Sequence, residues 1–216
     1  PSKLKNANKV ARECQKISSK SKIYTVCKME HAGGLLAQTL PAFEIGADID
    51  IEKFNAYKFC KKITNYTHTH LTPSHAKAIR LTKSFKNINL KGVWITCGSE
   101  PVEWSLIIDF VKKGCNFMVN WGMTEIGPCA INTVFKNLES VLDYKERAIN
   151  GTLIGDKTYC DTKIENNRLY SPNGFIKKFN IGDTLILRDI NGNEIRRTIE
   201  VYSLNYIVWN SYRKLI

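Results

Sequence analysis

Three consecutive segments between residues 92 and 122 limit what this chain can fold into. "GVWITCG" is an apolar run of strand length, "PVEWSLIIDFVKKG" reads as a helix with Pro101 near its start and Gly114 past its end, and "NFMVNWG" is a second apolar run. Strands that are apolar throughout are typical of parallel sheets that are covered on both faces. The order strand, helix, strand therefore predicts a βαβ unit.

The same alternation extends back to the N-terminus. Strands are predicted at "KIYTVCKM", "ADIDI" and "THTHLT", and helices at "NANKVARECQKI", "LLAQTLPAFEIG", "NAYKFCKKITNY" and "SHAKAIRLTKSF". We expect Pro41 to interrupt the second of these helices and Gly46 to close it, and Ser74 to cap the last. The predicted fold class is α/β, with a mostly parallel sheet, flanking helices and βαβ units.

The sequence changes character near residue 150. Short β-rich runs follow, broken by pairs of Asn and Gly, and "INGN" at 190–193 is typical of a hairpin turn. We therefore expect an α/β subdomain over 1–149, which would hold the ligand-binding crevice, and a small antiparallel β subdomain over 150–216.

Composition sets broad limits on the function. Apolar residues make up 43% of the 216 residues, enough to bury a core, and the formal net charge is +12. The excess of Lys and Arg is scattered rather than gathered in one tract, which favours a solvated basic surface. A basic nucleic-acid-binding module is kept as an alternative function, although nucleic acid is not the partner that the sequence favours.

The seven cysteines are odd in number, widely spaced and include no C-x-x-C pair. This pattern predicts reduced thiols in a cytoplasmic protein, with neither a zinc ribbon nor a secreted disulfide framework. No apolar run approaches the length that crosses a bilayer, so no membrane span is predicted. Cys97, at a strand end, is interpreted as a small buried residue rather than a nucleophile, because the sequence positions no base beside it.

Two polar strings follow neighbouring predicted strands, "CGSEP" at 97–101 and "NWGMTE" at 120–125. In open α/β sheets, ligands gather at the carboxyl ends of the strands. Trp121 can offer a flat face to a base, Gly122 lets the backbone approach a ligand, Thr124 supplies a hydroxyl for phosphate and Glu125 suits Mg²⁺. From the residues alone, a core tryptophan followed by a capped loop is the structural alternative.

The string "NWGMTEIGP" resembles the Tyr-Gly-x-Thr-Glu motif of the adenylate-forming (AMP-binding) superfamily, which includes the acyl-CoA synthetases. "CGSEP" is similar to the Gly-Gly-Glu-Pro stretch of that family. Further similar segments follow the family order over most of the chain: "EHAGGLLAQTLPAFEIGADI", "THTHLTPSHAKAI", "NGTLIG" and "FNIGDTLILRDINGN". This ordered series is more specific than any one of its motifs.

The resemblance implies roles for individual residues. Trp121 would stack on adenine, Thr124 would bond the α-phosphate, Glu125 would bind Mg²⁺, Asp183 would bind the ribose hydroxyls, and His31 would lie near the acyl group. Thr124, Glu125 and His31 form the implied catalytic set. The implied nucleotide-binding residues are Ser99, Glu100, Pro101, Asn120, Trp121, Gly122, Met123, Thr124 and Asp183. The implied substrate-binding residues are His31, Gly122 and Gly127, with Met123 shaping the same pocket.

The implied reaction joins a carboxylic acid to ATP with Mg²⁺, gives acyl-AMP and pyrophosphate, and transfers the acyl group to a thiol, with CoA as the expected co-substrate. Several expected parts are missing from the sequence. It contains no Ser/Thr/Gly-rich phosphate loop, Ile181 stands where the family has threonine, and no catalytic lysine of a C-terminal lid is identified, although Arg188, Arg196 and Arg197 follow Asp183. The chain is expected to be the middle of a longer ligase. The alternative is a non-catalytic AMP-binding subunit that needs a partner chain.

Three histidines need a separate interpretation. His68 and His70 share one face of a predicted strand and His75 follows five residues later, a spacing that would suit a metal. Because the resemblance places them on a structural strand and a helix start, the structural interpretation is preferred to a zinc site. His31 can likewise be read as a histidine that only accompanies a glycine turn.

Overall fold

The computed structural model describes the backbone of residues 2–123 and 127–147 and of short strands beyond residue 151, and the side chains over 4–122 and 127–146. Thr124, Glu125 and Asp183 lie outside the described residues, so their predicted roles are not placed by the structure. Within the described part, none of the helices is both long and apolar enough to cross a membrane.

Short helices and strands alternate along the chain, in the order that the sequence predicts up to residue 123. The helical elements are α1 (Ser2–Gln15), α2 (Ala32–Gly34), the π-helix η1 (Leu35–Thr39), α3 (Leu40–Phe43), α4 (Ala56–Lys62), η2 (Ile63–Asn65), α5 (Pro73–Arg80), η3 (Lys83–Asn87), α6 (Trp104–Val111) and α7 (Leu138–Arg147). The strands of the first sheet are β1 (Lys22–Thr25), β2 (Asp48–Ile51), β3 (His68–Leu71), β4 (Trp94–Gly98), β5 (Asn116–Met123), β6 (Gly127–Phe135) and β8 (Lys157–Thr158).

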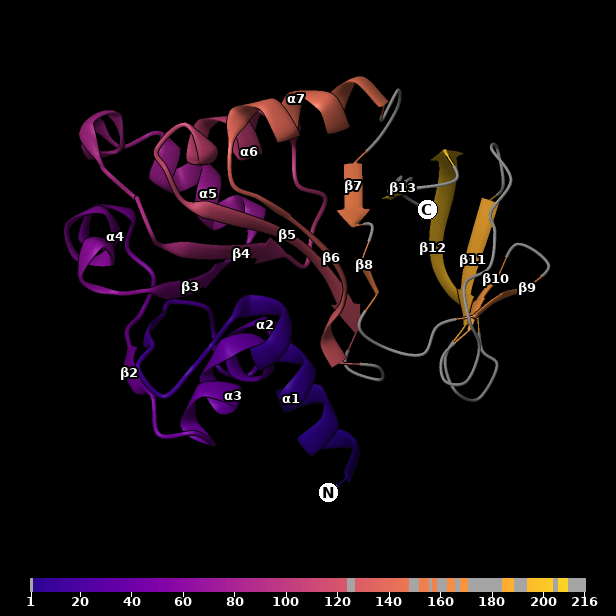
Figure 1. The fold of residues 1–216 in the computed structure, drawn as a ribbon, viewed down its shortest axis with the longest axis horizontal. Helices are drawn as coiled ribbons and strands as arrows, with labels where there is room; N and C mark the ends of the chain where they lie inside the picture. The colour runs from indigo at the N-terminus through magenta and orange to yellow at the C-terminus, as the bar shows by residue number, and fades with distance from the viewer. Residues whose placement is uncertain are drawn as a thin grey trace.

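The first sheet has the strand order β2-β1-β3-β4-β5-β6-β8 (Figure 1). Strands β2, β1, β3, β4 and β5 pair in parallel, whereas β6 is antiparallel to β5 and β8 is antiparallel to β6. The predicted α/β class with a mostly parallel sheet is therefore confirmed. Strand β6 and helix α7 were not predicted, although "CAINTVF" is an apolar run of strand length.

The second sheet has the order β7-β13-β12-β11-β10-β9. Its strands are β7 (Thr152–Gly155), β9 (Lys163–Glu165), β10 (Arg168–Tyr170), β11 (Thr184–Arg188), β12 (Glu194–Ser203) and β13 (Tyr206–Trp209). The pairs are antiparallel as predicted, except that β10 and β11 are parallel. Arg188 pairs with Glu194 on either side of the predicted "INGN" turn, which itself lies outside the described residues. The subdomain boundary near residue 150 stays a prediction.

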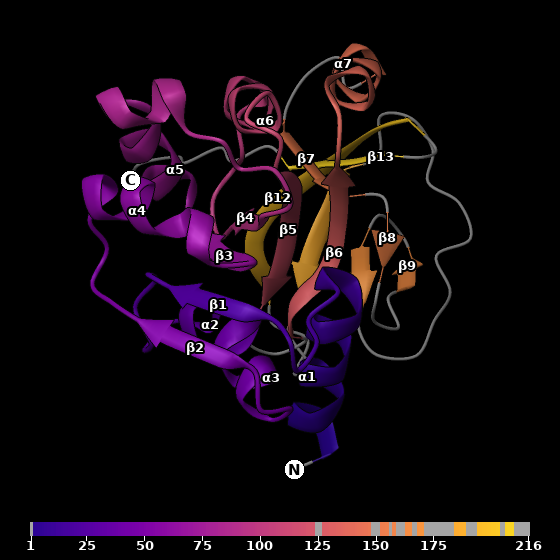
Figure 2. The ribbon, with the colours of Figure 1, turned by 60° about the vertical axis from the view of Figure 1, so that its left-hand side comes forward.

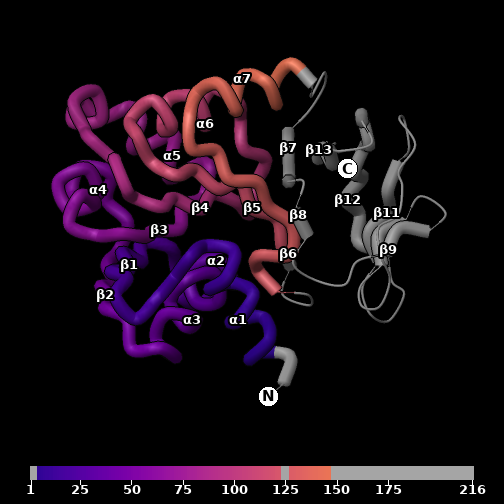
Figure 3. The backbone as a smooth tube through the Cα atoms, viewed as in Figure 1, coloured from indigo at the N-terminus to yellow at the C-terminus, as the bar shows by residue number. Residues whose placement is uncertain are grey.

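Helices cover both faces of the first sheet (Figure 2). On one face, α4–α7 pack on the main hydrophobic core, in which Phe59, Phe85, Phe110, Phe117 and Phe135 are buried. On the other face lie α1, α2, η1 and α3, and the backbone trace shows α1 running beside β6 (Figure 3). The second face is far more polar, since its buried side chains include glutamines, threonines and histidines.

The segment at residues 32–43 is helical throughout and is not interrupted by Pro41. The chain widens into the π-helix η1, where the N–H of Leu40 donates to the carbonyl of Leu35, and Pro41 sits in the first turn of α3. Proline has no N–H to donate to the carbonyl four residues before it, that of Ala37. Gln15 Nε2 donates to this carbonyl at 2.6 Å, so α1 supplies the missing donor.

The predicted cap of α5 is wrong by two residues. Thr72 is the N-cap, and its Oγ1 accepts a hydrogen bond from the N–H of His75 at 3.2 Å. Pro73 occupies the first helical turn, where its fixed φ suits a helix and its missing N–H costs nothing. Ser74 therefore lies inside the helix, and its hydroxyl is free to bond elsewhere.

Candidate functional site

The parallel strands β1, β3, β4 and β5 end at one edge of the sheet, and the segments that follow them carry most of the predicted site residues. His31 follows β1, Ser99–Pro101 follow β4, and Asn120–Met123 close β5. The register brings the last two segments together, because Gly98 pairs with Asn120. The fold thus places the two predicted strings side by side.

The end of β4 is shaped by a close backbone approach. A Cβ added to Gly98 would overlap the carbonyl oxygen of Asn120, so only glycine fits there. The next residue, Ser99, has φ +76°, in the left-handed region that non-glycine residues rarely adopt. Strained residues of this kind cluster at ligand sites. Here the positive φ of Ser99 changes the direction of the chain directly after β4.

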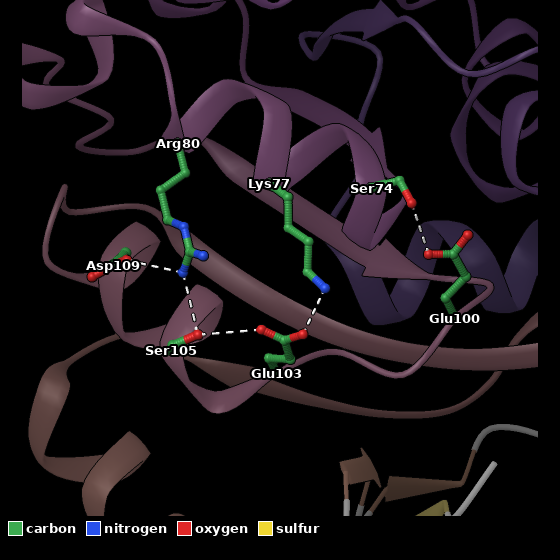
Figure 4. A network of polar contacts seen from close by, with 7 residues as sticks. All are labelled: Ser74, Lys77, Arg80, Glu100, Glu103, Ser105 and Asp109. Atoms are coloured by element: carbon green, nitrogen blue, oxygen red, sulfur yellow. Dashed lines mark hydrogen bonds and ion pairs between the residues drawn. The ribbon is translucent and has the colours of Figure 1, made fainter. Parts of the chain in front are cut away.

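Glu100 is exposed and already has one polar partner. Its Oε2 accepts a hydrogen bond from Ser74 Oγ at 3.0 Å (Figure 4). Two further contacts join α5 to the start and middle of α6, an ion pair of Lys77 with the N-cap residue Glu103 at 2.6 Å and one of Arg80 with Asp109 at 3.3 Å. The three surface contacts thus link α5 to residues 100–109, which begin at the turn 99–101 that we expect to line the base and ribose.

The end of β5 is equally tight. A Cβ on Gly122 would overlap the carbonyl oxygens of Pro128 and Gly127 on β6, and the pairing shifts register between Trp121 and Met123. Asn120 Nδ2 donates to the carbonyl of Pro128 at 2.6 Å. Gly127 has φ +101° and pairs with Met123. The loop between these two strands carries Thr124 and Glu125.

Trp121 is only 4% exposed, and its Nε1 has no hydrogen-bond partner among the described residues. Alternation along β5 puts it on the same face as Phe117 and Val119, which belong to the main core. The indole thus lies near the strand end but is covered in the free chain. Stacking on adenine stays a prediction, and it requires one face of the Trp121 ring to become open to the base.

His31 lies just before α2, and its side chain is 70% exposed. Its Nε2 is 3.9 Å from the carboxylate of Glu30, a loose and solvent-exposed contact. The two glycines that follow are packed closely: a Cβ on Gly33 would meet the ring of His70, and one on Gly34 would overlap the carbonyl of Lys28. The glycines therefore seat α2 against the sheet, with His31 free at its start.

His68 and His70 are buried and His75 is half-buried, and burial lowers the pKa of each. His68 Nε2 contacts the carbonyl of Gln15 at 2.9 Å. The pKa of His70 falls to about 4, through burial and then the charge of His75. The ring of His75 stacks on that of Phe54 with centroids 4.0 Å apart, and the charge of Glu100 offsets only part of the lowering of the His75 pKa by burial.

Cys27 lies between two of these rings. Its Sγ is 3.5 Å from His70 Nδ1 and 3.7 Å from His75 Nδ1, and burial raises the pKa of the thiol to about 12. Among residues 4–122 and 127–146, no group of three His, Cys, Asp or Glu side chains is arranged to hold a metal ion. Cys97 is fully buried in the main core and burial raises its pKa, as expected for a structural thiol.

Sequence reasoning missed a buried polar network on the α1 side of the sheet. Gln15 Oε1 accepts from Thr96 Oγ1 at 2.6 Å and from Gln38 Nε2 at 2.8 Å, and Gln38 Nε2 also donates to the carbonyl of Thr69 at 3.1 Å. The network therefore joins α1, η1, β3 and β4. Its only sequence signal is that glutamines occupy positions of helical segments that face the sheet.

No protein-family model matches the sequence, and no curated protein matches it. Solved structures do. The N-terminal domain of FACL13 from Mycobacterium tuberculosis is 12% identical with a TM-score of 0.67, over 97% of this chain and 55% of that one. An o-succinylbenzoate CoA synthetase (MenE) double mutant from Bacillus subtilis, bound with its product analogue OSB-NCoA, is 14% identical with a TM-score of 0.67, over 98% and 45%.

Apo MatB from Rhodopseudomonas palustris is 11% identical with a TM-score of 0.71, over 98% of this chain and 44% of that one. The chain thus shares the fold of these structures, as the resemblance noted in the sequence implies. The chain spans about half the length of these structures, between 44% and 55%.

Proposed function

We propose that this chain forms the nucleotide- and acyl-binding part of an adenylate-forming ligase. The observation that carries the proposal is the edge of the sheet at which Ser99–Pro101 and Asn120–Met123 lie at the ends of neighbouring parallel strands. Close backbone packing at this edge leaves no room for a side chain at Gly98 or Gly122. The edge belongs to a fold that is shared with acyl-CoA ligases. The proposed reaction is attack of a carboxylate on the α-phosphate of ATP with release of pyrophosphate, followed by transfer of the acyl group from acyl-AMP to a thiol with release of AMP, with CoA as the expected acceptor.

Catalysis in this proposal depends on positioning and on stabilisation of charge. The turn at 99–101 and Trp121 hold adenine and ribose, with Asp183 on the ribose hydroxyls, and Thr124 orients the α-phosphate by a hydrogen bond. Glu125 has the hard oxygen donor that Mg²⁺ prefers, and the ion would neutralise phosphate charge. His31, exposed at the start of α2, lies near the acyl carboxylate.

The adenine contact is tested by Trp121→Ala, with AMP affinity measured by calorimetry. Loss of base stacking should weaken AMP binding by about 1–3 kcal/mol. Trp104→Ala is the matched control, because it also removes a tryptophan but at a position that is not among the predicted nucleotide-binding residues. Trp104 lies on α6 and packs against the main core, with its ring 6.0 Å from that of Phe135. Equal AMP affinity in the parent and Trp121→Ala proteins would refute the assignment of Trp121.

The metal and ribose roles are separated by two isosteric variants. Glu125→Gln should abolish the effect of Mg²⁺ on ATP binding and leave metal-free AMP binding unchanged. Asp183→Asn should weaken AMP with and without metal. The division of roles fails if both variants respond to Mg²⁺ in the same way.

A second candidate function is binding of AMP without catalysis. The 216-residue sequence contains no glycine-rich phosphate loop that could hold the β- and γ-phosphates. We expect these 216 residues on their own to bind AMP weakly and to show no carboxylate-dependent exchange of pyrophosphate into ATP. Exchange with any aliphatic or aromatic acid would show that another part of the chain holds the β- and γ-phosphates, for which the basic residues of "PSKLKNANK" are the first candidates.

Tight DNA or RNA binding with a steep salt dependence would instead favour the nucleic-acid alternative.

A further inference from the structure

A row of three residues crosses the sheet beside the proposed site. Gly98 on β4 pairs with Asn120 on β5, and Asn120 pairs with Asn132 on β6. The next row, Thr96, Met118 and Val134, contacts α1 and its surroundings. Because side chains alternate along a strand, the Gly98–Asn120–Asn132 row lies on the same face, and α1, α2 and η1 all contact β6 there.

The two asparagines of this row are buried and largely unpartnered. Asn132 is 0% exposed, and neither its Oδ1 nor its Nδ2 has a hydrogen-bond partner among residues 4–122 and 127–146. Asn120 is 7% exposed; its Nδ2 bonds to the carbonyl of Pro128, but its Oδ1 has no partner within the same ranges. Within the described residues, three of the four amide atoms of the pair therefore have no hydrogen-bond partner.

Leaving buried amide atoms unbonded costs about 1–3 kcal/mol for each group. Directly opposed residues on antiparallel strands lie close enough for side-chain contact, yet these two amides do not bond to each other. Gly98, the third member of the row, adds no side chain that could satisfy them. The pair is thus suited to a polar group from outside the chain, with ordered water in its place when that group is absent.

We propose that the Asn120–Asn132 pair binds a polar group on the acyl chain of the substrate, so that the acid is one with a hydroxyl or carboxamide at its far end. This inference rests on the proposed function, which puts the reacting carboxylate near the end of β5. The available atoms are two carbonyl oxygens and one NH₂ group, which complement a group that both donates and accepts. A second carboxylate accepts only and would face the two amide oxygens, so dicarboxylates are disfavoured.

The position of the pair limits the length of the acid. Asn120 is three residues before Met123, which corresponds to about 10 Å along a strand. An acid with about six to eight chain atoms would reach from the strand end to the amides. A buried site that is built to hydrogen-bond a substrate rejects analogues that lack the bonding group.

Calorimetry on the 216-residue protein with saturating AMP tests this with four acids that share a six-carbon chain. The acids are hexanoate, 6-hydroxyhexanoate, 6-amino-6-oxohexanoate and adipate. We expect the hydroxy and amide acids to bind about 10- to 100-fold more tightly than hexanoate, and adipate to gain no such advantage. Asn132→Leu should remove the preference and leave AMP affinity unchanged. Asn132→Thr is the second variant, which keeps a hydroxyl of smaller size.

The outcomes separate the two proposals. If AMP binds and the polar acids show no advantage over hexanoate, the polar subsite is refuted and the proposed function stands. If the preference exists but persists in both Asn132 variants, the pair does not cause it and the inference is refuted. If Asn132→Leu only stabilises the fold, the amides hold water and nothing else. Failure of AMP itself to bind would overturn the proposed function, and the subsite with it.

Discussion

The two faces of the first sheet are built from the same strands but differ in chemistry. The face under α4–α7 is apolar, with a run of phenylalanines whose ring centroids lie 4.8 Å apart for Phe85 and Phe110, and 5.6 Å apart for Phe110 and Phe117. The face under α1, α2 and η1 buries Gln15, Gln38 and the Asn120–Asn132 pair. A fully buried parallel sheet does not require buried polar side chains. Apolar residues would cover the same face without the free-energy cost of polar groups that lack partners.

The contrast indicates a division of tasks. The apolar face supplies non-directional stability, which tolerates substitutions that keep the buried apolar volume. The polar face has directional bonds that specify one arrangement of α1, η1 and the strand ends, next to the proposed acyl site. Four experiments can break or sharpen this comparison, and they follow in order of expected effect.

The largest effect is expected on the apolar face. Phe110→Ala removes a fully buried ring between Phe85 and Phe117 and should lower the free energy of unfolding by about 3–5 kcal/mol. Urea unfolding followed by circular dichroism measures the loss, and Phe110→Leu should cost much less. A loss below about 1 kcal/mol for Phe110→Ala would mean that this face is not the main source of stability.

The next effect is a dependence on pH from the polar face. His70 is fully buried with a pKa of about 4, below its unfolded value of about 6.5. The folded state therefore favours the neutral ring, and this contribution is complete above pH 6.5 and is lost as the pH falls from 6.5 through 4. The full loss is about 3 kcal/mol. Burial lowers the pKa of His68 and His75 too, in the same direction.

Comparing unfolding curves of the parent protein and His70→Asn between pH 4 and pH 7 isolates this term from the carboxylates that titrate in the same range. The difference in unfolding free energy between the two proteins should shrink as the pH falls. Parallel curves would show that His70 is not held neutral by burial.

A somewhat smaller loss is expected for Gln15→Leu. The change leaves the carbonyl of Ala37 without its donor and removes the acceptor shared by Thr96 and Gln38, at a cost of about 2 kcal/mol. A double-mutant cycle with Thr96→Val measures the coupling. Additive losses for the two changes would deny that these residues act as one network.

The smallest effect tests the cap of α5. Thr72→Ala should cost about 1 kcal/mol because the N–H of His75 loses its acceptor. Ser74→Ala is the control: it removes only an exposed contact with Glu100 and should change stability little. The reverse ranking would restore Ser74 as the cap.

The sequence predicted the framework well because strand and helix periods are local properties. Apolar strands such as 92–98 and 116–122 and the glycine at 114 identify βαβ units without tertiary information. The cap of α5 was misplaced because Thr72, Pro73 and Ser74 each suit a helix start, and only the observed bond of Thr72 decides between them.

The candidate site was only partly predictable. The order of short polar strings located the strand ends, and the register of β4 with β5 shows why those ends meet. Burial of Trp121 agrees with the structural alternative that the sequence left open. The unpartnered amides of Asn120 and Asn132 could not be foreseen, because they depend on β6, whose antiparallel pairing with β5 has no marked signal in the sequence. The same holds for the Gln15 network, which joins residues 81 positions apart.

The bond between Gln15 and the carbonyl of Ala37 has a consequence for evolution. Pro41 removes a main-chain donor, and a side chain from another helix replaces it. The two positions are therefore coupled: while residue 41 is proline, residue 15 must keep a donor of the right length. A substitution at 41 that restores the N–H would release Gln15 from this constraint. Among related chains, glutamine at 15 should accompany proline at 41, and the two should be lost together.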